Sequence, residues 1–323
     1  MKQENKKPTK GTLIYQPKGP AGEYAKWAIN LFSGCSNGCA YCYNRRGMLS
    51  HVFGDEPKLA APIFKLRSKL VMEYIKQYVT EFGIDSPFDL PDDKVREMTV
   101  DAIWTILDRD VQKIGLDRLR KNGGVFMSFT CDPCDKEIYT YTEKAMMALM
   151  YNLGIPVTIL TKNVDWLDNE KAEIYCDRMR AKANLLTIGF TITGMDELEP
   201  NAPSSNERIN ALERVRAMGY KTFVSMEPIV KFYRAKDVLM DIMGETDEIR
   251  LGLQSPFKKD RYDPAELIEF LQYLCAASRA TPETKIVLKK SFFDERLYKQ
   301  IPAHLHDDYM QVVNELKCNE PMD

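Results

Sequence analysis

Residues 31–43 read Leu31-Phe-Ser-Gly-Cys35-Ser-Asn-Gly-Cys39-Ala-Tyr-Cys42-Tyr43, a C-x3-C-x2-C pattern with Tyr41 directly before the third cysteine. Three thiolates this close in sequence can all reach one small inorganic cluster. A cubane iron–sulfur cluster has four irons and usually takes four cysteines, so three cysteines leave one iron open to another ligand. The pattern therefore predicts that Cys35, Cys39 and Cys42 together bind one small inorganic cluster.

A structural zinc site is the alternative interpretation of these cysteines. Such a site takes four ligands, commonly from two separated C-x2-C pairs, and Cys131 and Cys134 form a pair of that type. The two motifs together hold one cysteine more than zinc needs, and zinc does not account for Gly34 and Gly38. A disulfide is the weakest alternative, because clustered cysteines in a cytosolic chain more often bind metal or act in catalysis.

The composition is that of an ordinary globular chain. It has 323 residues, of which 44% are hydrophobic, and a formal net charge of −2 at pH 7. This length holds one large α/β domain or two smaller ones. No apolar run is long enough to cross a bilayer, and the N-terminus Met-Lys-Gln-Glu-Asn-Lys-Lys lacks the apolar segment of a signal peptide. We expect a cytoplasmic protein with no membrane partner, and the net charge gives no overall attraction to nucleic acid.

Candidate strands alternate with candidate helices along most of the chain. The strands are expected at residues 27–33, 124–129, 156–161, 186–192, 221–226 and 248–253. A helix over 143–153 ends before Gly154, and one over 205–218 begins with a capping box at Ser204 and ends before Gly219. This alternation predicts parallel βαβ units. We therefore expect an α/β fold, a partial (β/α)6 barrel with an enlarged helical crossover after the first strand.

The domain organisation follows from the same pattern. Residues 1–20 are rich in lysine and predict a flexible N-terminal tail. Residues 21–257 form the partial barrel, including a helical insertion over 56–122 with helix-period apolar residues at 63–82 and 94–119. Residues 258–323 predict an α-rich C-terminal extension packed on the barrel.

Polar residues follow each candidate strand. In a parallel α/β barrel the functional groups lie beyond the carboxyl ends of the strands, so these residues are expected on one rim with the cysteine loop. They are Thr130-Cys131-Asp132-Pro133, Lys162-Asn163, Thr191 with Thr193, Glu227-Pro228 and Gln254-Ser255-Pro256.

Further runs carry a resemblance to a known family. They are Ser128-Phe-Thr130-Cys-Asp132-Pro133, Gly154-Ile-Pro156-Val-Thr-Ile-Leu160-Thr-Lys162-Asn163, Phe190-Thr-Ile-Thr193, and Glu199-Pro200 with Ala202-Pro203 and Arg208. Together with the cysteine motif they resemble the spore photoproduct lyase-like branch of the radical S-adenosylmethionine superfamily, from about Asn30 to about Ile229.

The resemblance implies an enzyme with a [4Fe-4S] cluster and S-adenosylmethionine. An external one-electron donor of the flavodoxin or ferredoxin type would drive reductive cleavage of the cofactor to a 5′-deoxyadenosyl radical, which abstracts a substrate hydrogen. A DNA photoproduct lyase-like activity is one candidate, and nucleic acid, peptide and metabolite substrates stay open, as does the oligomeric state. The alternative is a non-catalytic iron–sulfur or zinc-binding module on the same fold.

The resemblance also implies cofactor contacts. Lys162 would pair with the cofactor carboxylate, a role that suits a lysine ammonium. Tyr41 would pack against adenine, and Glu227 would contact the ribose or the sulfonium. Further cofactor contacts are implied at Thr130, Cys131 and Thr191.

The chain departs from the family at the hydrogen-donating cysteine, whose position is occupied by Phe129. Cys131 and Cys134 are nearby and are candidate hydrogen donors, while the other interpretation is that both are inert packing residues. The dispersed cysteines Cys176, Cys275 and Cys318 are expected to be structural.

Overall fold

The computed structural model describes residues 11–46, 50–51, 53–82, 90–168, 174, 177–254 and 261–318. The chain divides into two compact units, of which unit one comprises Met1–Ser36 and Phe53–Thr158 and unit two comprises Asn37–Val52 and Ile159–Asp323. The chain passes between the units twice near the cysteine motif and once inside a strand, so each unit is assembled from separate stretches of sequence.

Unit one is built on a small sheet. Its strands are β1 (Ile14–Tyr15), β2 (Ala28–Ile29), β5 (Val125–Met127) and the first residues of β6 (Val157–Thr161), in that order across the sheet. β1 runs antiparallel to β2, and β2 runs parallel to β5. A separate antiparallel pair is formed by β3 (Phe32–Ser33) and β4 (Lys58–Leu59). The strand predicted at 27–33 is therefore broken between β2 and β3.

Glycine is required where β5 begins. The backbone of Gly124 has φ +77°, and an added Cβ would lie 1.8 Å from the carbonyl oxygen of Pro156. The amide of the next residue, Val125, donates to that same oxygen at 2.9 Å. Only a residue without a side chain permits this approach of the two backbones.

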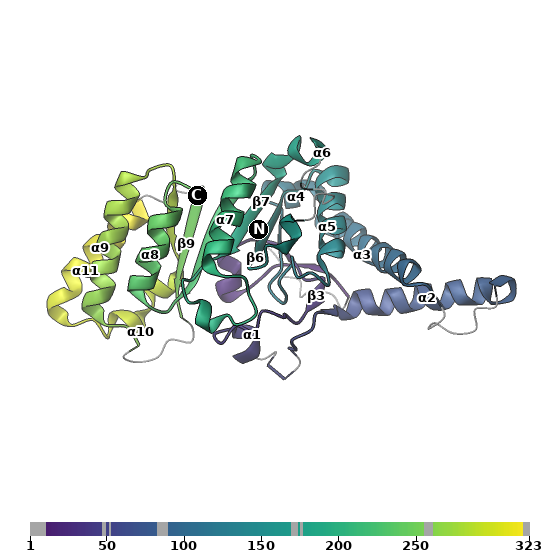
Figure 1. Cartoon of the computed structure of the whole chain (residues 1–323), viewed down its shortest axis with the longest axis horizontal. Coiled ribbons are helices and arrows are strands. Elements are labelled where there is room, and N and C mark those ends of the chain that lie inside the picture. Colours follow the sequence, from purple (N-terminus) through teal and green to yellow (C-terminus); the bar gives the residue numbers. More distant parts are fainter. Residues whose placement is uncertain are drawn as a thin grey trace, which may run out of the picture. The chain divides into compact units, whose positions relative to one another are not determined.

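The helices of unit one include α2 (Ala61–Phe82) and α3 (Asp92–Ile114), which pack on each other and extend from the unit as long rods (Figure 1). Val71, Ile75, Leu90 and Met98 form a hydrophobic cluster of their own at this contact. The unit also contains η1 (Gly19–Glu23), α4 (Leu116–Lys121), α5 (Tyr139–Met147) and the π-helical turn η3 (Ala148–Asn152). Of these helices, α2, α3 and α4 lie in the crossover that the sequence predicts after the first strand, over residues 56–122.

Buried Asp110 on α3 holds the N-terminal strand of unit one. Its Oδ2 accepts hydrogen bonds from the amides of Leu13 and Ile14, at 2.6 and 3.1 Å. A buried carboxylate needs such donors because it has lost its water. β1 thus lies within the segment that the sequence predicts to be a tail.

Unit two continues the parallel pattern. Its strands follow the order β6, β7 (Leu186–Thr191), β8 (Lys221–Ile229), β9 (Glu248–Leu253) and β10 (Lys285–Leu288). Neighbours from β7 to β10 are parallel. β10 was not expected: its four residues are a short apolar run within a helical region, and periodicity does not separate such a run from buried helix.

Helices α7 (Ser205–Ala217), α8 (Phe232–Ile242), α9 (Pro264–Ala280) and α11 (His306–Cys318) accompany these strands (Figure 1). The capping box at Ser204 and Glu207 forms as predicted. The shorter elements are α1 (Tyr43–Arg46), η4 (Asp165–Leu167), α6 (Asp177–Arg180), η6 (Ala183–Leu185), η7 (Asp196–Leu198), η8 (Lys290–Phe293), α10 (Glu295–Tyr298) and η9 (Ala303–Leu305).

The predicted α/β class with parallel strands is confirmed, and every predicted strand is present except the first, which is divided between β2 and β3. The closure into a partial barrel and the domain boundaries stay predictions. β10 lies inside the segment predicted as an α-rich extension. No helix among the described residues has the length and apolar character needed to cross a membrane.

Candidate functional site

The cysteine loop begins in unit one, where its backbone is held closely. The amide of Gly34 donates to the carbonyl oxygen of Thr130 at 2.9 Å, and that of Cys35 donates to Gly54 at 3.1 Å. Gly34 has φ +110°, and a Cβ there would lie 2.2 Å from the carbonyl oxygen of Glu56. Gly34 is therefore needed both for its backbone angle and for the close approach of residues 54–56.

The rest of the loop, with Cys39 and Cys42, belongs to unit two. The amide of Ala40 donates to the carbonyl oxygen of Leu198 at 2.8 Å, and that of Cys42 donates to Cys39 at 3.1 Å. Gly38 has φ +67°, and a Cβ there would lie 3.0 Å from Nδ2 of Asn201. The segment from η7 to Asn201 thus supports this part of the loop.

The donor set of the motif consists of three free thiols, of which Cys39 is buried and Cys35 and Cys42 are half-buried. Burial raises the pKa of Cys39, while the ammonium of Lys162 opposes that rise. Thiolates are the ordinary ligands of iron–sulfur clusters, so the residues fit such a group. Across the described part of the chain, no three His, Cys, Asp or Glu side chains could hold a metal ion; a cubane differs from a single ion because each thiolate binds its own iron.

Tyr41 and Lys162, two residues predicted to bind the cofactor, lie together in unit two. Lys162 follows β6, and its Nζ lies 5.5 Å from the centroid of the Tyr41 ring, within the range of a cation–π contact. The Tyr41 hydroxyl donates a short hydrogen bond to Oε1 of Glu199. Burial, and then the negative charge of Glu199, raise the pKa of Tyr41 well above its usual value, so the hydroxyl keeps its proton.

Glu199 belongs to a buried polar network that the sequence analysis did not foresee. Its carboxylate also accepts a hydrogen bond from Oγ1 of Thr193 at 2.9 Å and pairs with Arg208 on α7. The side chains of both Glu199 and Arg208 are 0% exposed. Both residues are part of the quoted family runs, but no sequence signal marks them as buried, since Glu and Arg are usually exposed.

Thr130, Cys131 and Cys134, all in unit one, follow β5. The Thr130 hydroxyl donates to the carbonyl oxygen of Phe32 at 2.6 Å. The Cys131 thiol lies 3.3 Å from Oγ of Ser128, and burial raises its pKa to about 12. Cys131 therefore stays a neutral thiol near pH 7. Cys134 is buried, and its amide is bound by Asp132 at 3.0 Å.

Phe129, at the position of the family's hydrogen donor, is a packed aromatic residue. Its ring stacks on Phe126 with centroids 4.5 Å apart and an interplanar angle of 13°. Its amide donates to Oδ1 of Asn30 at 2.9 Å. The position is therefore fixed by packing and carries no transferable hydrogen of the thiol type.

Thr191 and Glu227 lie in unit two. Thr191 is buried, and its carbonyl oxygen accepts a hydrogen bond from Nη1 of Arg208 at 2.5 Å. Oε2 of Glu227 pairs with Nζ of Lys289 at 2.5 Å. Gly252 leaves room for the Glu227 side chain, because a Cβ there would lie 2.9 Å from Oε1. Lys289 follows β10, the strand that was not predicted, so its place beside Glu227 could not be foreseen.

The other residues that the sequence analysis named are Gln254, Ser255, Pro256 and the dispersed cysteines. The amide of Gln254 is bound by the Tyr262 hydroxyl at 2.8 Å, whereas Ser255 and Pro256 lie outside the described residues. Cys275 on α9 is buried, as a structural cysteine would be. Cys176 and the side chain of Cys318 lie outside the described residues.

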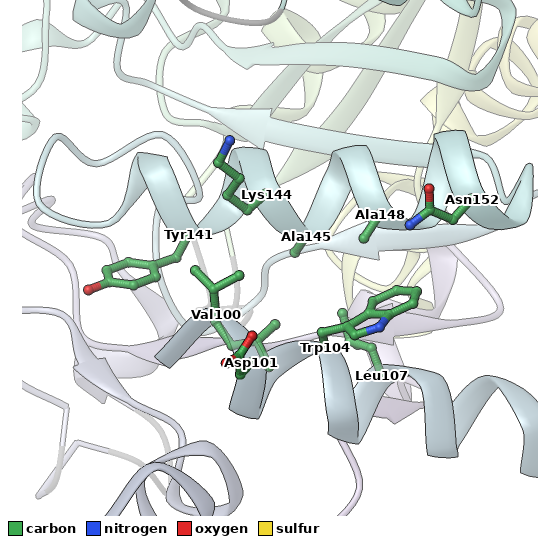
Figure 2. A pocket seen from close by; sticks show the side chains of 10 residues that line it. Val100, Asp101, Trp104, Leu107, Tyr141, Lys144, Ala145, Ala148 and Asn152 are labelled. Atoms are coloured by element: carbon green, nitrogen blue, oxygen red, sulfur yellow. The ribbon is translucent and has the colours of Figure 1, made fainter. Parts of the chain in front are cut away.

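A pocket of about 220 Å³ lies elsewhere in unit one, between α3 and the α5–η3 helix (Figure 2). Trp104 and Asp101 line it from α3, and Tyr141, Lys144 and Asn152 line it from the facing helix. It contains none of the residues predicted for the cofactor or the cluster.

Comparison with known proteins adds a structural likeness. No family model matches the chain, and no curated protein matches it. Streptococcus suis SuiB bound to S-adenosylmethionine is 12% identical, with a TM-score of 0.42, 76% of this chain covered and 69% of that chain. A mutant of spore photoproduct lyase with bound AdoMet and dinucleoside spore photoproduct is 13% identical, with a TM-score of 0.45, 94% of this chain covered and 76% of that chain.

SuiB bound to its precursor peptide SuiA is 11% identical, with a TM-score of 0.40, 72% of this chain covered and 67% of that chain. In another SuiB structure the chain spans 66% of that chain.

Proposed function

We propose that this chain is a radical S-adenosylmethionine enzyme. Cys35, Cys39 and Cys42 would hold a [4Fe-4S] cluster, which would supply the electron for reductive cleavage of S-adenosylmethionine and so the radical chemistry that takes a hydrogen atom from a substrate. The observation that carries the proposal is the loop itself: three free thiols at C-x3-C-x2-C spacing, with Tyr41 beside Lys162.

The protein's task is to bind, orient and shield the reacting groups. Lys162 offers a half-buried ammonium, a compact charge suited to the cofactor carboxylate. The adjacent Tyr41 ring offers an aromatic surface for adenine. Because both residues already lie together in unit two, they are placed to bind one ligand. Thr130, Cys131 and Thr191 are the further proposed contacts.

Glu227 is the proposed contact for the ribose or the sulfonium. Lys289 pairs with its Oε2, and this ion pair fixes the carboxylate in one orientation. A fixed acceptor loses less conformational entropy on binding a ribose hydroxyl than a free side chain does.

The substrate chemistry is proposed from the residues after β5. Phe129 occupies the family's donor position, so a hydrogen returned to a substrate radical must come from elsewhere. Cys131 is the better candidate, because its raised pKa keeps the S–H bond, and that bond is weak enough to give hydrogen to a carbon radical. A photoproduct lyase-like reaction on DNA is one candidate, although the net charge of −2 gives no overall attraction to nucleic acid.

The electron is proposed to come from an external donor of the flavodoxin or ferredoxin type in the cytoplasm, where thiols stay reduced. Anaerobic reconstitution tests the whole proposal. The wild-type chain should take up about four irons, as a cubane requires, and should release 5′-deoxyadenosine from S-adenosylmethionine once reduced.

Replacing Cys35, Cys39 or Cys42 by Ala should remove most of the iron. Cys275→Ala is the matched control, because Cys275 is a buried free thiol on α9 outside the loop, and it should keep the full iron content. Stoichiometric zinc without iron uptake would instead support the metal-binding module and refute the enzyme.

A further inference from the structure

The buried charge pair of Glu199 and Arg208 is unusual for its complete burial. Removing a charge from water is costly in a protein interior, and only well-made partners offset that cost. An apolar pair of similar volume would serve packing alone equally well. The observation to explain is therefore why this place in unit two holds charges at all.

Arg208 is held by the segments on either side of it. Its Nη1 donates to the carbonyl oxygen of Thr191 at the end of β7, at 2.5 Å. Its Nε lies 3.3 Å from the carbonyl oxygen of Ser204, and its Nη2 lies 3.4 Å from Oδ1 of Asp196. The planar guanidinium thus fixes the end of β7, η7 and the start of α7 relative to one another.

Glu199 extends this network to the cysteine loop. It comes directly after η7, and its carboxylate binds the hydroxyl of Tyr41, a residue 158 positions away in sequence. A backbone hydrogen bond joins the same two segments, since the amide of Ala40 donates to the carbonyl oxygen of Leu198 at 2.8 Å. Arg208, Glu199 and Tyr41 therefore form one chain of hydrogen bonds that ends between Cys39 and Cys42.

We propose that Glu199 and Arg208 are positioning residues, which act through the Tyr41 hydroxyl to hold Cys39 and Cys42 ready for the cluster and the Tyr41 ring ready for the cofactor. This assignment rests on the proposed function for the identity of the ligands. The positioning itself is a property of the apoprotein and can be measured without them.

The charges of the network also balance. Arg208 compensates the Glu199 carboxylate, which accepts the hydrogen bond of the Tyr41 hydroxyl. Without Arg208, a buried carboxylate with no counter-charge from α7 would lie beside Tyr41.

The decisive variant is Tyr41→Phe, which removes one hydroxyl and keeps the ring. Its control is Tyr220→Phe, because the Tyr220 hydroxyl also lies in unit two and donates to the carbonyl oxygen of Ile174 at 2.7 Å, outside the cysteine loop. Each variant loses one tyrosine hydroxyl and its hydrogen bond, so the control reports the general loss of stability.

The first measurement is the rate at which iodoacetamide alkylates Cys39 in the apoprotein, followed by mass spectrometry. Cys39 is 8% exposed, so the reaction reports local opening of the loop. Alkylation should be about tenfold faster in Tyr41→Phe and unchanged in Tyr220→Phe, the effect of losing a hydrogen bond worth about 1.4 kcal/mol. Equal rates in both variants would overturn the inference, whether or not the chain binds a cluster.

The second measurement uses the reconstituted protein. The affinity for S-adenosylmethionine should fall about tenfold in Tyr41→Phe only. Glu199→Gln should raise the reduction potential of the cluster, because it removes a negative charge close to Cys39 and eases addition of an electron. If the wild-type chain takes up no iron, the proposed function is wrong. The alkylation rates of the apoprotein would then decide by themselves whether Glu199 and Arg208 position the loop.

Discussion

The ion pair between Glu227 and Lys289 gives a prediction that depends on tertiary structure alone. Lys289→Met removes the ammonium whose Nζ lies 2.5 Å from Oε2 of Glu227. The Lys289 side chain is 4% exposed and that of Glu227 is 27% exposed. The two partners are therefore not equivalent, because water can reach the carboxylate but hardly reaches the ammonium.

The expected magnitudes follow from this difference. Removing one partner of a buried pair costs about 3–5 kcal/mol, because the other charge is left without a counter-charge. Glu227→Gln leaves the ammonium of Lys289 buried and should cost that full amount. Lys289→Met leaves a carboxylate that water partly solvates, so it should cost less, about 1–3 kcal/mol.

The double variant Glu227→Gln/Lys289→Met leaves neither charge. Its loss of stability should therefore be smaller than the sum of the two single losses, with a coupling energy of about 2 kcal/mol in the double-mutant cycle. The assay is urea unfolding of the apoprotein under reducing conditions, compared through the midpoints of the transitions. Equal losses in the two single variants, or a double variant whose loss is the sum of both, would refute the reasoning.

Three further predictions concern the loop and its neighbours. Gly34→Ala should sharply reduce iron uptake, because its Cβ would lie 2.2 Å from the carbonyl oxygen of Glu56. Gly219→Ala controls for backbone strain, because Gly219 also has a positive φ but nothing within 4 Å of its Cβ. Equal iron uptake by the two variants would contradict the steric role of Gly34. Lys162→Ala should weaken binding of S-adenosylmethionine by about 1.5–3 kcal/mol, the usual worth of a hydrogen bond to a charged group, and unchanged affinity in equilibrium dialysis would remove Lys162 from the site. Cys131 should alkylate slowly near pH 8 and faster only as the pH approaches its pKa of about 12, because the thiolate is the reactive form; a reaction that is already complete within minutes at pH 8 would show that the thiol is not shielded.

Short-range sequence patterns predicted many of the helices and strands of this protein. The spacing of Cys35, Cys39 and Cys42 predicted a shared ligand site, which stays a prediction. The capping box at Ser204 set the start of α7, and apolar runs bounded by turn residues located the strands from β5 to β9. These signals succeed because each depends on residues a few positions apart, through backbone angles, capping hydrogen bonds and side-chain periodicity.

The tertiary structure decided which charged groups are buried and what they face. Tyr41 meets Glu199 across 158 positions, and Glu227 meets Lys289 across 62. β10, which directly precedes Lys289, became a strand because its four residues pair with β9. No short-range pattern encodes such contacts, since the energy of a buried charge depends on partners brought together by the fold and on the water that the fold excludes.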